Sequence, residues 1–478
     1  MIVQGDWQEV FSFGGQERIV LEASEAQLTP HAGLLPLRAL DAQLGLTEAF
    51  ADALDDRRGP ELREHTVAEM TRARIYGILA DHEDQNDHDT LRTDPIFKLL
   101  VGRSPDGSAL ASQPTLSRFE NSINIPSLKR LKDVFIDQFI ASFAEPPRHL
   151  VFDLDAVDDP AHGDQQLTFW HNYYDQNQYL PLVVTCANNG LVVMLSLRHG
   201  CAHAALGADD DLNYLVRRVR RAWPNVLIYV RGDAAFGCPA MFEACERWER
   251  LFYTFGYNAN AVLQRWTEGL LARAVTTWDE ERQRARAAER PAVPARLFEG
   301  TWYQAETWDG QRWVIAKAEA NEQGTNRRFV VTNRPQAWLF PTATYDEYVQ
   351  RGESENRNKE IKCGCFMGRL SDHRFVANYF RLYLAGAALN LLIRFRQAVR
   401  VPEAAGAAAA EVAPGGEVPP EAFEGEQRRT VFPGAAAARR LGARSAGHLA
   451  AAGDPGGGGG GGQCPPRVGT PVGVLAAP

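Results

Sequence analysis

Cysteine is scarce in this sequence, and its spacing forms no metal-binding pattern. The chain has seven cysteines and no CxxC pair. Cys363 and Cys365 come nearest to one, but side chains so close along a helix point apart, so we expect no zinc site. Few cysteines without a pairing pattern are typical of a reducing compartment, and we expect a cytoplasmic protein.

Long apolar runs are also missing. The start, MIVQGDWQEVF, has an early aspartate and no apolar stretch, so a signal peptide is not expected. The most apolar segment, LYLAGAALNLLIRF at 382–395, is shorter than the ~18–20 residues of a membrane span and contains Asn390. It predicts a buried helix, and we expect no membrane partner.

An excess of positive charge is absent as well. Asp and Glu number 60 against 51 Lys and Arg, a net charge of −9. This excludes a protein that coats nucleic acid with its whole surface, but not a local basic groove. Residues 351–400 carry ten Arg or Lys and four Asp or Glu, a local charge of +6. A polyanionic partner would therefore meet one face only.

What is present is enough apolar residues for a core, in two patterns. Apolar residues make up 45% of the chain, as in globular proteins. Between about 30 and 145 they recur at three- and four-residue gaps, which predicts a mainly helical region. From 148 the pattern changes to strand-like runs: HLVFDLDAV, LPLVVTC and LVVMLSL, with the turn NNG between the last two.

The order of elements after residue 148 predicts an α/β fold. Three strands are followed by a helix, the strand NVLIYVRGD, a second helix and the strand LFYTFGY. This order predicts a sheet with an antiparallel start and a parallel edge. The pattern predicts further strands in residues 296–333 and a helix over 344–398. The Ala-, Gly- and Pro-rich segment after Val401 is expected to be disordered.

Acidic residues occur where such a fold collects ligands. The first and fourth strands end in FDLDAVDD and RGD, so Asp155 and Asp233 can converge if those strands are adjacent. Glu355, on a later helix, would add a third hard oxygen ligand of the kind that Mg²⁺ prefers. Each residue also has an ordinary explanation: the aspartates as turn or cap residues, and Glu355 as a surface ion pair.

The residues around Glu355 form a spaced motif. Tyr348, Arg351, Glu355 and Lys362 are separated by two, three and six residues. With this motif the chain resembles the DDE transposases of bacterial insertion sequences, in the group with a Y-R-E-K signature. The resemblance runs from about residue 30 to 400 and takes in LRTDPIFKLLVGR, SQPTLSRFEN and SDHRFVANYFRLYL. It implies an RNase H-like mixed sheet with flanking helices, interrupted by a β-rich insertion and preceded by a helical N-terminal domain.

The resemblance also implies roles for single residues. The catalytic and Mg²⁺-binding triad, with Mn²⁺ able to replace Mg²⁺, would be Asp155, Asp233 and Glu355. The residues that hold DNA phosphates would be Tyr348, Arg351 and Lys362.

The identity of the first metal ligand stays open. Many relatives have Asp-x-Thr at this site, and here Val157 replaces the threonine. Strand alternation places Asp153 and Asp155 on one face, so either aspartate fits.

Three other stretches have two interpretations each. SQPTLSRFEN, 112–121, is either a DNA-recognition helix or a surface helix capped by Ser112. DHEDQNDHD, 81–89, is either a cation site or a solvated acidic turn. Tryptophans of the β-rich insertion either stack on a flipped base or pack the strands. The residues of the recognition helix that would contact DNA are Gln113, Thr115, Ser117 and Arg118, and the three tryptophans are Trp302, Trp308 and Trp313.

These features together predict a transposase of five segments. They are a helical DNA-end-binding domain (1–146), the first part of the catalytic core (147–290), the insertion (291–343), the helical end of the core (344–400) and the tail (401–478). The protein is expected to bind the terminal inverted repeats of its element as a homodimer, and to cleave and join double-stranded DNA with Mg²⁺. It would be bacterial, cytoplasmic, and associated with the nucleoid when bound to DNA. The alternatives are a structure-selective nuclease on the same core and a catalytically inactive DNA-binding descendant.

Overall fold

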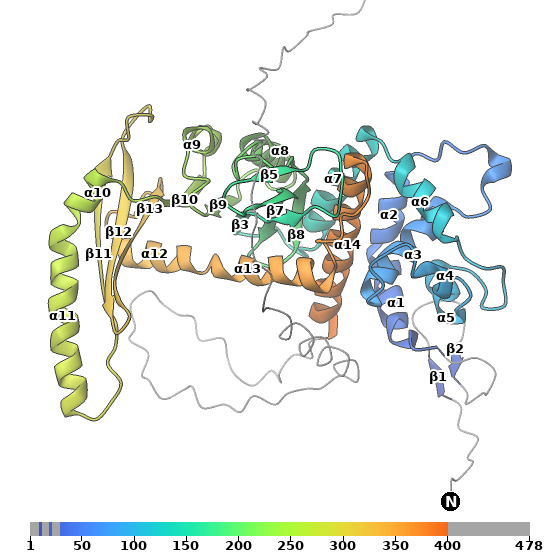
Figure 1. The fold of residues 1–478 in the computed structure, drawn as a ribbon, viewed down its shortest axis with the longest axis horizontal. Helices are drawn as coiled ribbons and strands as arrows, with labels where there is room; N and C mark the ends of the chain where they lie inside the picture. Colours follow the sequence, from blue (N-terminus) through green and yellow to red (C-terminus); the bar gives the residue numbers. More distant parts are fainter. Residues whose placement is uncertain (1–8, 12–18, 22–28, 400–478) are drawn as a thin grey trace, which may run out of the picture. The chain divides into compact units, whose positions relative to one another are not determined.

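The structure, a computed structural model, describes residues 9–11, 19–21 and 29–399 (Figure 1). The tail predicted at 401–478 lies outside the described residues, as does most of the segment on which the signal-peptide expectation rests. Near the start of the chain, β1 (Glu9–Phe11) and β2 (Ile19–Leu21) pair antiparallel.

The region from residue 32 to residue 141 is helical, as the apolar periodicity predicts. Side-chain caps explain two of the helix starts: Thr66 and Glu69 form a capping box, and Asn124 accepts from the backbone of Ser127. The helices are η1 (Ala32–Leu34), α1 (Leu35–Leu44), α2 (Leu46–Asp52), η2 (Pro60–Leu62), α3 (Val67–Leu79), α4 (His88–Leu91), α5 (Pro95–Val101), α6 (Gln113–Ser122) and α7 (Ile125–Ala141).

A mixed sheet of eight strands forms the centre of the described chain, in the order β11-β12-β13-β10-β9-β3-β7-β8. β7 pairs antiparallel with β3 and β8, whereas β9 pairs parallel with β3 and β10. The predicted antiparallel start and the parallel pairing of the later strands are therefore confirmed. The prediction of a parallel edge was wrong, because β13 pairs antiparallel with β10 and the parallel strands lie inside the sheet. The strands named in these pairings are β3 (His149–Ala156), β7 (Leu182–Cys186), β8 (Val192–Ser196), β9 (Leu227–Gly232) and β10 (Leu251–Tyr257). Helix α8 (Ala208–Ala222) lies between β8 and β9 in the chain, and α9 (Pro239–Glu246) lies between β9 and β10.

The strands predicted between 296 and 333 extend this same sheet. They are β11 (Ala295–Tyr303), β12 (Arg312–Asn321) and β13 (Gly324–Thr332), and β13 pairs antiparallel with β10. Two helices precede them that the sequence analysis did not predict, α10 (Ala261–Trp266) and α11 (Glu268–Ala287). The long helix α11 lies along β11 and β12 (Figure 1). The segment boundaries proposed from the sequence stay a prediction.

The helix predicted over 344–398 is interrupted, so that prediction was wrong in one place. The chain forms α12 (Pro341–Val349), α13 (Gly352–Lys359), the π-helical turn η3 (Glu360–Gly364) and α14 (Phe375–Val399). Between η3 and α14 it leaves the helix, and Phe366 has a positive φ of 53°. Gly364 ends η3 and Gly368 lies within this break, and glycine is a poor helix former because it loses the most backbone entropy.

Helix α14 is the one described helix long and apolar enough to cross a membrane, judged by length and composition. In the structure 83% of its apolar window is buried inside the protein. Asn390 exchanges two 2.8 Å hydrogen bonds with the backbone of Val192 in the edge strand β8. This polar contact within the core confirms the prediction of a buried helix.

A small three-stranded sheet lies between β3 and β7 in the chain, and the sequence analysis did not predict it. Its strands are β4 (Asp159–Pro160), β5 (Phe169–His171) and β6 (Gln176–Tyr179), in the order β4-β6-β5.

Candidate active site

Two of the three predicted acidic residues lie at the ends of adjacent parallel strands. The register of β3 on β9 pairs Leu154 with Gly232, so Asp155 and Asp233 are the next residues at the same edge of the sheet. One oxygen of each carboxylate accepts a backbone N–H a residue or two further on, at 3.0 Å for Asp155 and 2.9 Å for Asp233. The backbone thus orients both carboxylates where parallel strands end.

Glu355 reaches this edge from α13 but remains largely exposed, with 57% of its side chain accessible. The guanidinium of Arg351 lies between the carboxylates: it is 3.6 Å from Asp155 and 3.4 Å from Glu355. Within the described residues no three His, Cys, Asp or Glu side chains are spaced to hold a metal ion. The positive charge of Arg351 thus lies between two acidic side chains.

The charges of Asp233 and Glu355 nevertheless act on Asp155. Burial raises the pKa of Asp155 to about 6; Arg351 opposes the rise, and the negative charges of Asp233 and Glu355 add to it. A nearby cation stabilises the ionised form of such a carboxylate. The cation offsets the repulsion between the carboxylates and the loss of solvation on burial. A cation beside Asp155, the role that Arg351 has in this structure, therefore stabilises the ionised carboxylate.

Asn358 is a residue of this site that the sequence analysis missed. Its amide nitrogen donates to Asp155 Oδ2 at 2.7 Å. The side chain is 9% exposed, and its Oδ1 is buried without a hydrogen-bond partner in the described structure. The signal available in the sequence is its position three residues after Glu355, which places both on one helix face. Asn358 therefore fixes one oxygen of Asp155, while its own amide oxygen is buried without a partner in the described structure.

Asp153, the alternative first ligand, has a different partner. Arg231 donates to both of its oxygens, at 2.6 and 2.8 Å, and the Asp153 side chain is 2% exposed. Arg231 also donates to the backbone oxygen of Glu347 at 2.7 Å, so the pair connects the sheet to α12. Both carboxylate oxygens of Asp153 are thus already used in the described structure.

The other members of the Tyr-Arg-Glu-Lys motif lie around the same edge. Tyr348 is near the end of α12, and a Cβ added at Gly256 would lie 2.9 Å from its hydroxyl, so the glycine leaves room for it. Burial raises the pKa of Tyr348, and Arg351 opposes this. Lys362 lies in the π-helical turn and forms a 2.9 Å ion pair with Asp158. π-helical turns often occur at functional sites, because they redirect side chains.

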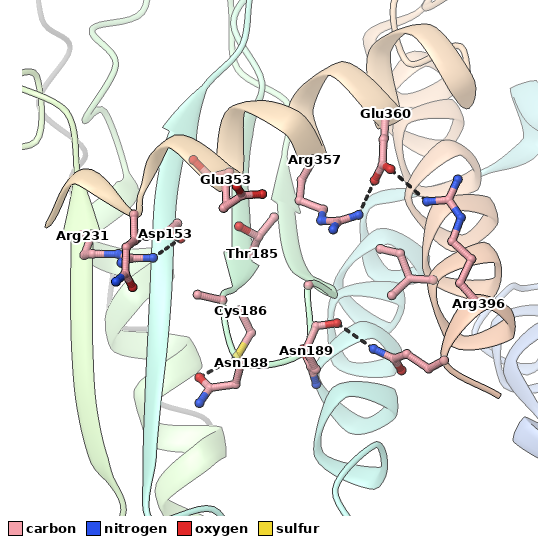
Figure 2. Close-up of a pocket in the computed structure, with 16 residues that line it drawn as sticks. Asp153, Thr185, Cys186, Asn188, Asn189, Arg231, Glu353, Arg357, Glu360 and Arg396 are labelled. Atoms are coloured by element: carbon pink, nitrogen blue, oxygen red, sulfur yellow. Dashed lines mark hydrogen bonds and ion pairs between the residues drawn. The ribbon is translucent and has the colours of Figure 1, made fainter. Parts of the chain in front are cut away.

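A pocket of about 550 Å³ lies between α13, the strands and the end of α14, and it is distinct from this acidic edge (Figure 2). Asp153 and Arg231 pair on one side of it, and Arg357 and Arg396 both contact Glu360 on the other. Because the charges that line it are largely paired with one another, the pocket offers no unpaired cation or carboxylate cluster. The predicted triad does not line it.

The candidate recognition helix is α6, and its predicted DNA contacts lie at its accessible positions. Leu116 and Phe119 are buried and hold the helix on the core. Ser112 occupies the predicted N-cap position but makes no capping hydrogen bond; instead its hydroxyl lies 3.1 Å from that of Thr115. Arg118 is exposed, and the other three candidates are partly exposed: Gln113, Thr115 and Ser117.

The tryptophans predicted for base stacking are not equivalent. Trp308 is buried against Phe242 and Tyr257, whereas Trp302 is 61% exposed on β11 and meets Trp313 edge-on at 5.4 Å. In the acidic stretch 81–89, Gln85 and His88 are buried. The stretch is therefore not a fully solvated turn.

The fold and the acidic edge define a class of protein, an RNase H-like core with carboxylates at the carboxyl ends of adjacent strands. The family model for the transposase DDE domain, group 1, matches residues 11–413, and the chain belongs to the DDE transposases. No curated protein matches the chain. A solved structure of a piggyBac transposase synaptic complex with hairpin DNA is similar at 10% identity over 75% of each chain, with a TM-score of 0.39.

Proposed function

We propose that this transposase binds the terminal inverted repeats of its element and catalyses Mg²⁺-dependent DNA cleavage and strand transfer. The observation that carries the proposal is the meeting of Asp155 and Asp233 at one sheet edge, with Glu355 coupled to them from α13. Membership of the DDE transposases supports the same assignment.

The catalytic residues in this proposal are Asp155, Asp233 and Glu355, which would hold Mg²⁺ or, in its place, Mn²⁺. Divalent ions of this kind neutralise the phosphate and activate the attacking oxygen. The chain itself supplies the carboxylates, and Asn358 orients Asp155 through its 2.7 Å hydrogen bond. Asp153 is assigned a structural role, because Arg231 already engages both of its oxygens.

DNA is positioned by cations on both sides of Glu355. Arg351 now contacts Asp155 and Glu355, and with a metal ion bound it would contact a DNA phosphate instead. Lys362 would likewise contact a phosphate in place of Asp158. Tyr348 adds a hydroxyl donor. On α6, the DNA contacts are assigned to Gln113, Thr115, Ser117 and Arg118. Pairing of two element ends requires a homodimer, and the proposed place of action is the bacterial cytoplasm.

The test uses duplex DNA that carries the inverted repeats found beside the gene. Asp155→Asn, Asp233→Asn and Glu355→Gln should each reduce cleavage by several orders of magnitude while end binding persists. Glu353→Gln, a change of an exposed residue on the same helix, is the matched control and should cleave as wild type. Calorimetric Mn²⁺ binding gives an independent readout, and each triad variant should weaken it.

Three outcomes would refute the proposal. Near wild-type cleavage by Glu355→Gln removes Glu355 from the site. Cleavage that depends on DNA structure but not on the repeat sequence supports a structure-selective nuclease. End binding by wild-type protein without any cleavage supports an inactive DNA-binding descendant.

A further inference from the structure

The small sheet β4-β6-β5 projects from the catalytic edge of the main sheet. Ala156 at the end of β3 and Leu182 at the start of β7 are register partners. Residues 157–181 therefore leave the main sheet and return to it at one place, next to Asp155. Within this segment β5 and β6 pair antiparallel, with His171 opposite Gln176. We call residues 169–179 the aromatic hairpin.

The aromatic hairpin exposes large aromatic side chains. Trp170 is 50% exposed and Tyr173 is 85% exposed. Tyr173 meets Tyr174 edge-on, with ring centroids 5.0 Å apart. Exposed side chains of this size, gathered at one place, are a common mark of a binding surface.

The base of the hairpin is held firmly, although its tip is exposed. A Cβ added at Gly200 would lie 1.9 Å from the backbone oxygen of Gln178 and 2.5 Å from that of Phe169, so only glycine allows this approach. The hydroxyl of Tyr179 donates to the backbone oxygen of Gln166 at 2.6 Å. The backbone N–H of Gln166 in turn donates to the backbone oxygen of His373, just before α14. The hairpin is thus a fixed projection.

A single carboxylate connects the hairpin to the signature lysine. Asp158 Oδ1 forms the ion pair with Lys362 at 2.9 Å, and Asp158 Oδ2 accepts from the side chain of Gln176 in β6 at 3.2 Å. The negative charges of Asp158, Asp155 and Asp233 also raise the pKa of Tyr174, after the larger effect of burial. The aromatic hairpin is therefore connected through Asp158 to a phosphate-binding candidate, and its segment leaves the sheet next to Asp155.

We propose that the aromatic hairpin stacks on unpaired bases of the DNA end next to the cleaved phosphodiester. The inference rests on the proposed function, since it assumes DNA at the acidic edge. Aromatic faces accept any base, because every base has a π-face, and neighbouring cations hold the backbone. Trp170 and Tyr173 would take the bases, and Lys362 the adjoining phosphate. A flipped or frayed base at this point would keep the cleaved strand within reach of Asp155 and Asp233.

The test measures stacking and cleavage separately. A single-stranded oligonucleotide and an element end with unpaired terminal bases each carry 2-aminopurine, whose fluorescence falls on stacking. Wild-type protein should quench both probes. Trp170→Ala and Tyr173→Ala should lose quenching and bind the unpaired DNA about ten-fold or more weakly, with little change on a fully paired duplex. Both residues are exposed, so the variants should fold.

Two further variants sharpen the result. Trp338→Ala removes an exposed tryptophan just before α12 and should leave quenching unchanged. Gly200→Ala keeps both aromatic residues but displaces the hairpin, and it should reduce quenching in a protein whose thermal unfolding is still cooperative.

The outcomes separate this inference from the proposed function. If wild type cleaves element ends but Trp170→Ala and Tyr173→Ala quench the probes as wild type does, the inference is overturned and the proposed function is kept. Quenching that depends on Trp170, without any end cleavage by wild type, would overturn the proposed function and would leave the aromatic hairpin only as a binding site for unpaired bases. A change of oligomeric state in Trp170→Ala with unchanged quenching would identify a second copy as the occupant, and would also overturn the inference.

Discussion

Asn358 shows how much of this site depends on single hydrogen bonds. It is not part of the Tyr-Arg-Glu-Lys spacing, yet it makes the shortest side-chain contact to Asp155 among those described. Residues that orient a metal ligand typically contribute 10- to 100-fold to metal affinity or activity.

Asn358→Ala should therefore weaken calorimetric Mn²⁺ binding by about 10- to 100-fold. The amide no longer orients Asp155, and the unpaired oxygen beside it is lost. The control is Asn356→Ala, a change of an exposed asparagine on the same helix that should bind Mn²⁺ as wild type does. Equal Mn²⁺ affinity in the two variants would limit Asn358 to packing.

His88 is a buried histidine that makes stability depend on pH. Burial, helped by the charge of Arg74, lowers its pKa well below the ordinary value of 6.5, and Arg74 lies 3.2 Å from Nε2. The folded state therefore holds His88 neutral, whereas the unfolded state binds a proton below about pH 6.5. Its contribution to stability is present above that pH and is lost as the pH falls.

The contribution of His88 to the free energy of unfolding should accordingly drop on acidification below about pH 6.5, by up to about 1.4 kcal/mol per pH unit for this one proton. His31, His65 and His199 also have lowered pKa values and act in the same direction. Asp155, with its pKa raised to about 6, acts in the opposite direction. The informative quantity is thus the difference between proteins: urea unfolding of His88→Gln should show a shallower pH slope than wild type. Exposed His203→Gln should keep the wild-type slope.

At the scale of elements, apolar periodicity predicted the strands of the core correctly. Each strand from β3 to β10 that lies in the main sheet corresponds to an apolar run. In β7 and β8 every residue is buried, and in β9 most are. The three strands β4 to β6 were missed, since they are short, polar or exposed and depend on contacts with distant residues such as Gly200. The break between η3 and α14 was also missed, because an apolar pattern does not show where a helix is interrupted.

Helix α6 gives a prediction at this scale. Arg118→Ala should weaken binding to element ends more than to random DNA, because a lost base contact costs about 1–3 kcal/mol. Quantitative gel shifts on both DNAs measure the ratio, with exposed Lys129→Ala on α7 as a matched loss of one cation. An equal loss on both DNAs would make Arg118 a phosphate contact, and no loss would make α6 an ordinary surface helix.

At the scale of the whole molecule, buried charges tie the N-terminal helices to the core. Glu120 of α6 is fully buried and pairs with Arg74 of α3 at 2.7 Å and with Arg381 of α14 at 2.6 Å. The element that carries the candidate recognition helix is thus connected to the last helix of the catalytic core.

Glu120→Ala should destabilise the protein by about 3–5 kcal/mol, because it leaves two arginines without their buried partner. Urea unfolding measures the change. Glu280→Ala, which removes an exposed partner of Arg284, should stay within about 0.5 kcal/mol of wild type. If Glu120→Ala were equally mild, water would have to replace the carboxylate, and the connection between α6 and α14 would be weak.

The sequence by itself determined the order of elements, the acidic candidates and the family. Periodicity and residue spacing are local properties, and the Tyr348–Lys362 motif is readable without any contact. Only the tertiary structure decided which residues meet. It paired Asp153 with Arg231, placed Arg351 between Asp155 and Glu355, brought Asn358 onto Asp155 and set the aromatic hairpin beside Lys362. These contacts join residues far apart in the chain, and their geometry follows from strand register and helix packing, which no local pattern encodes.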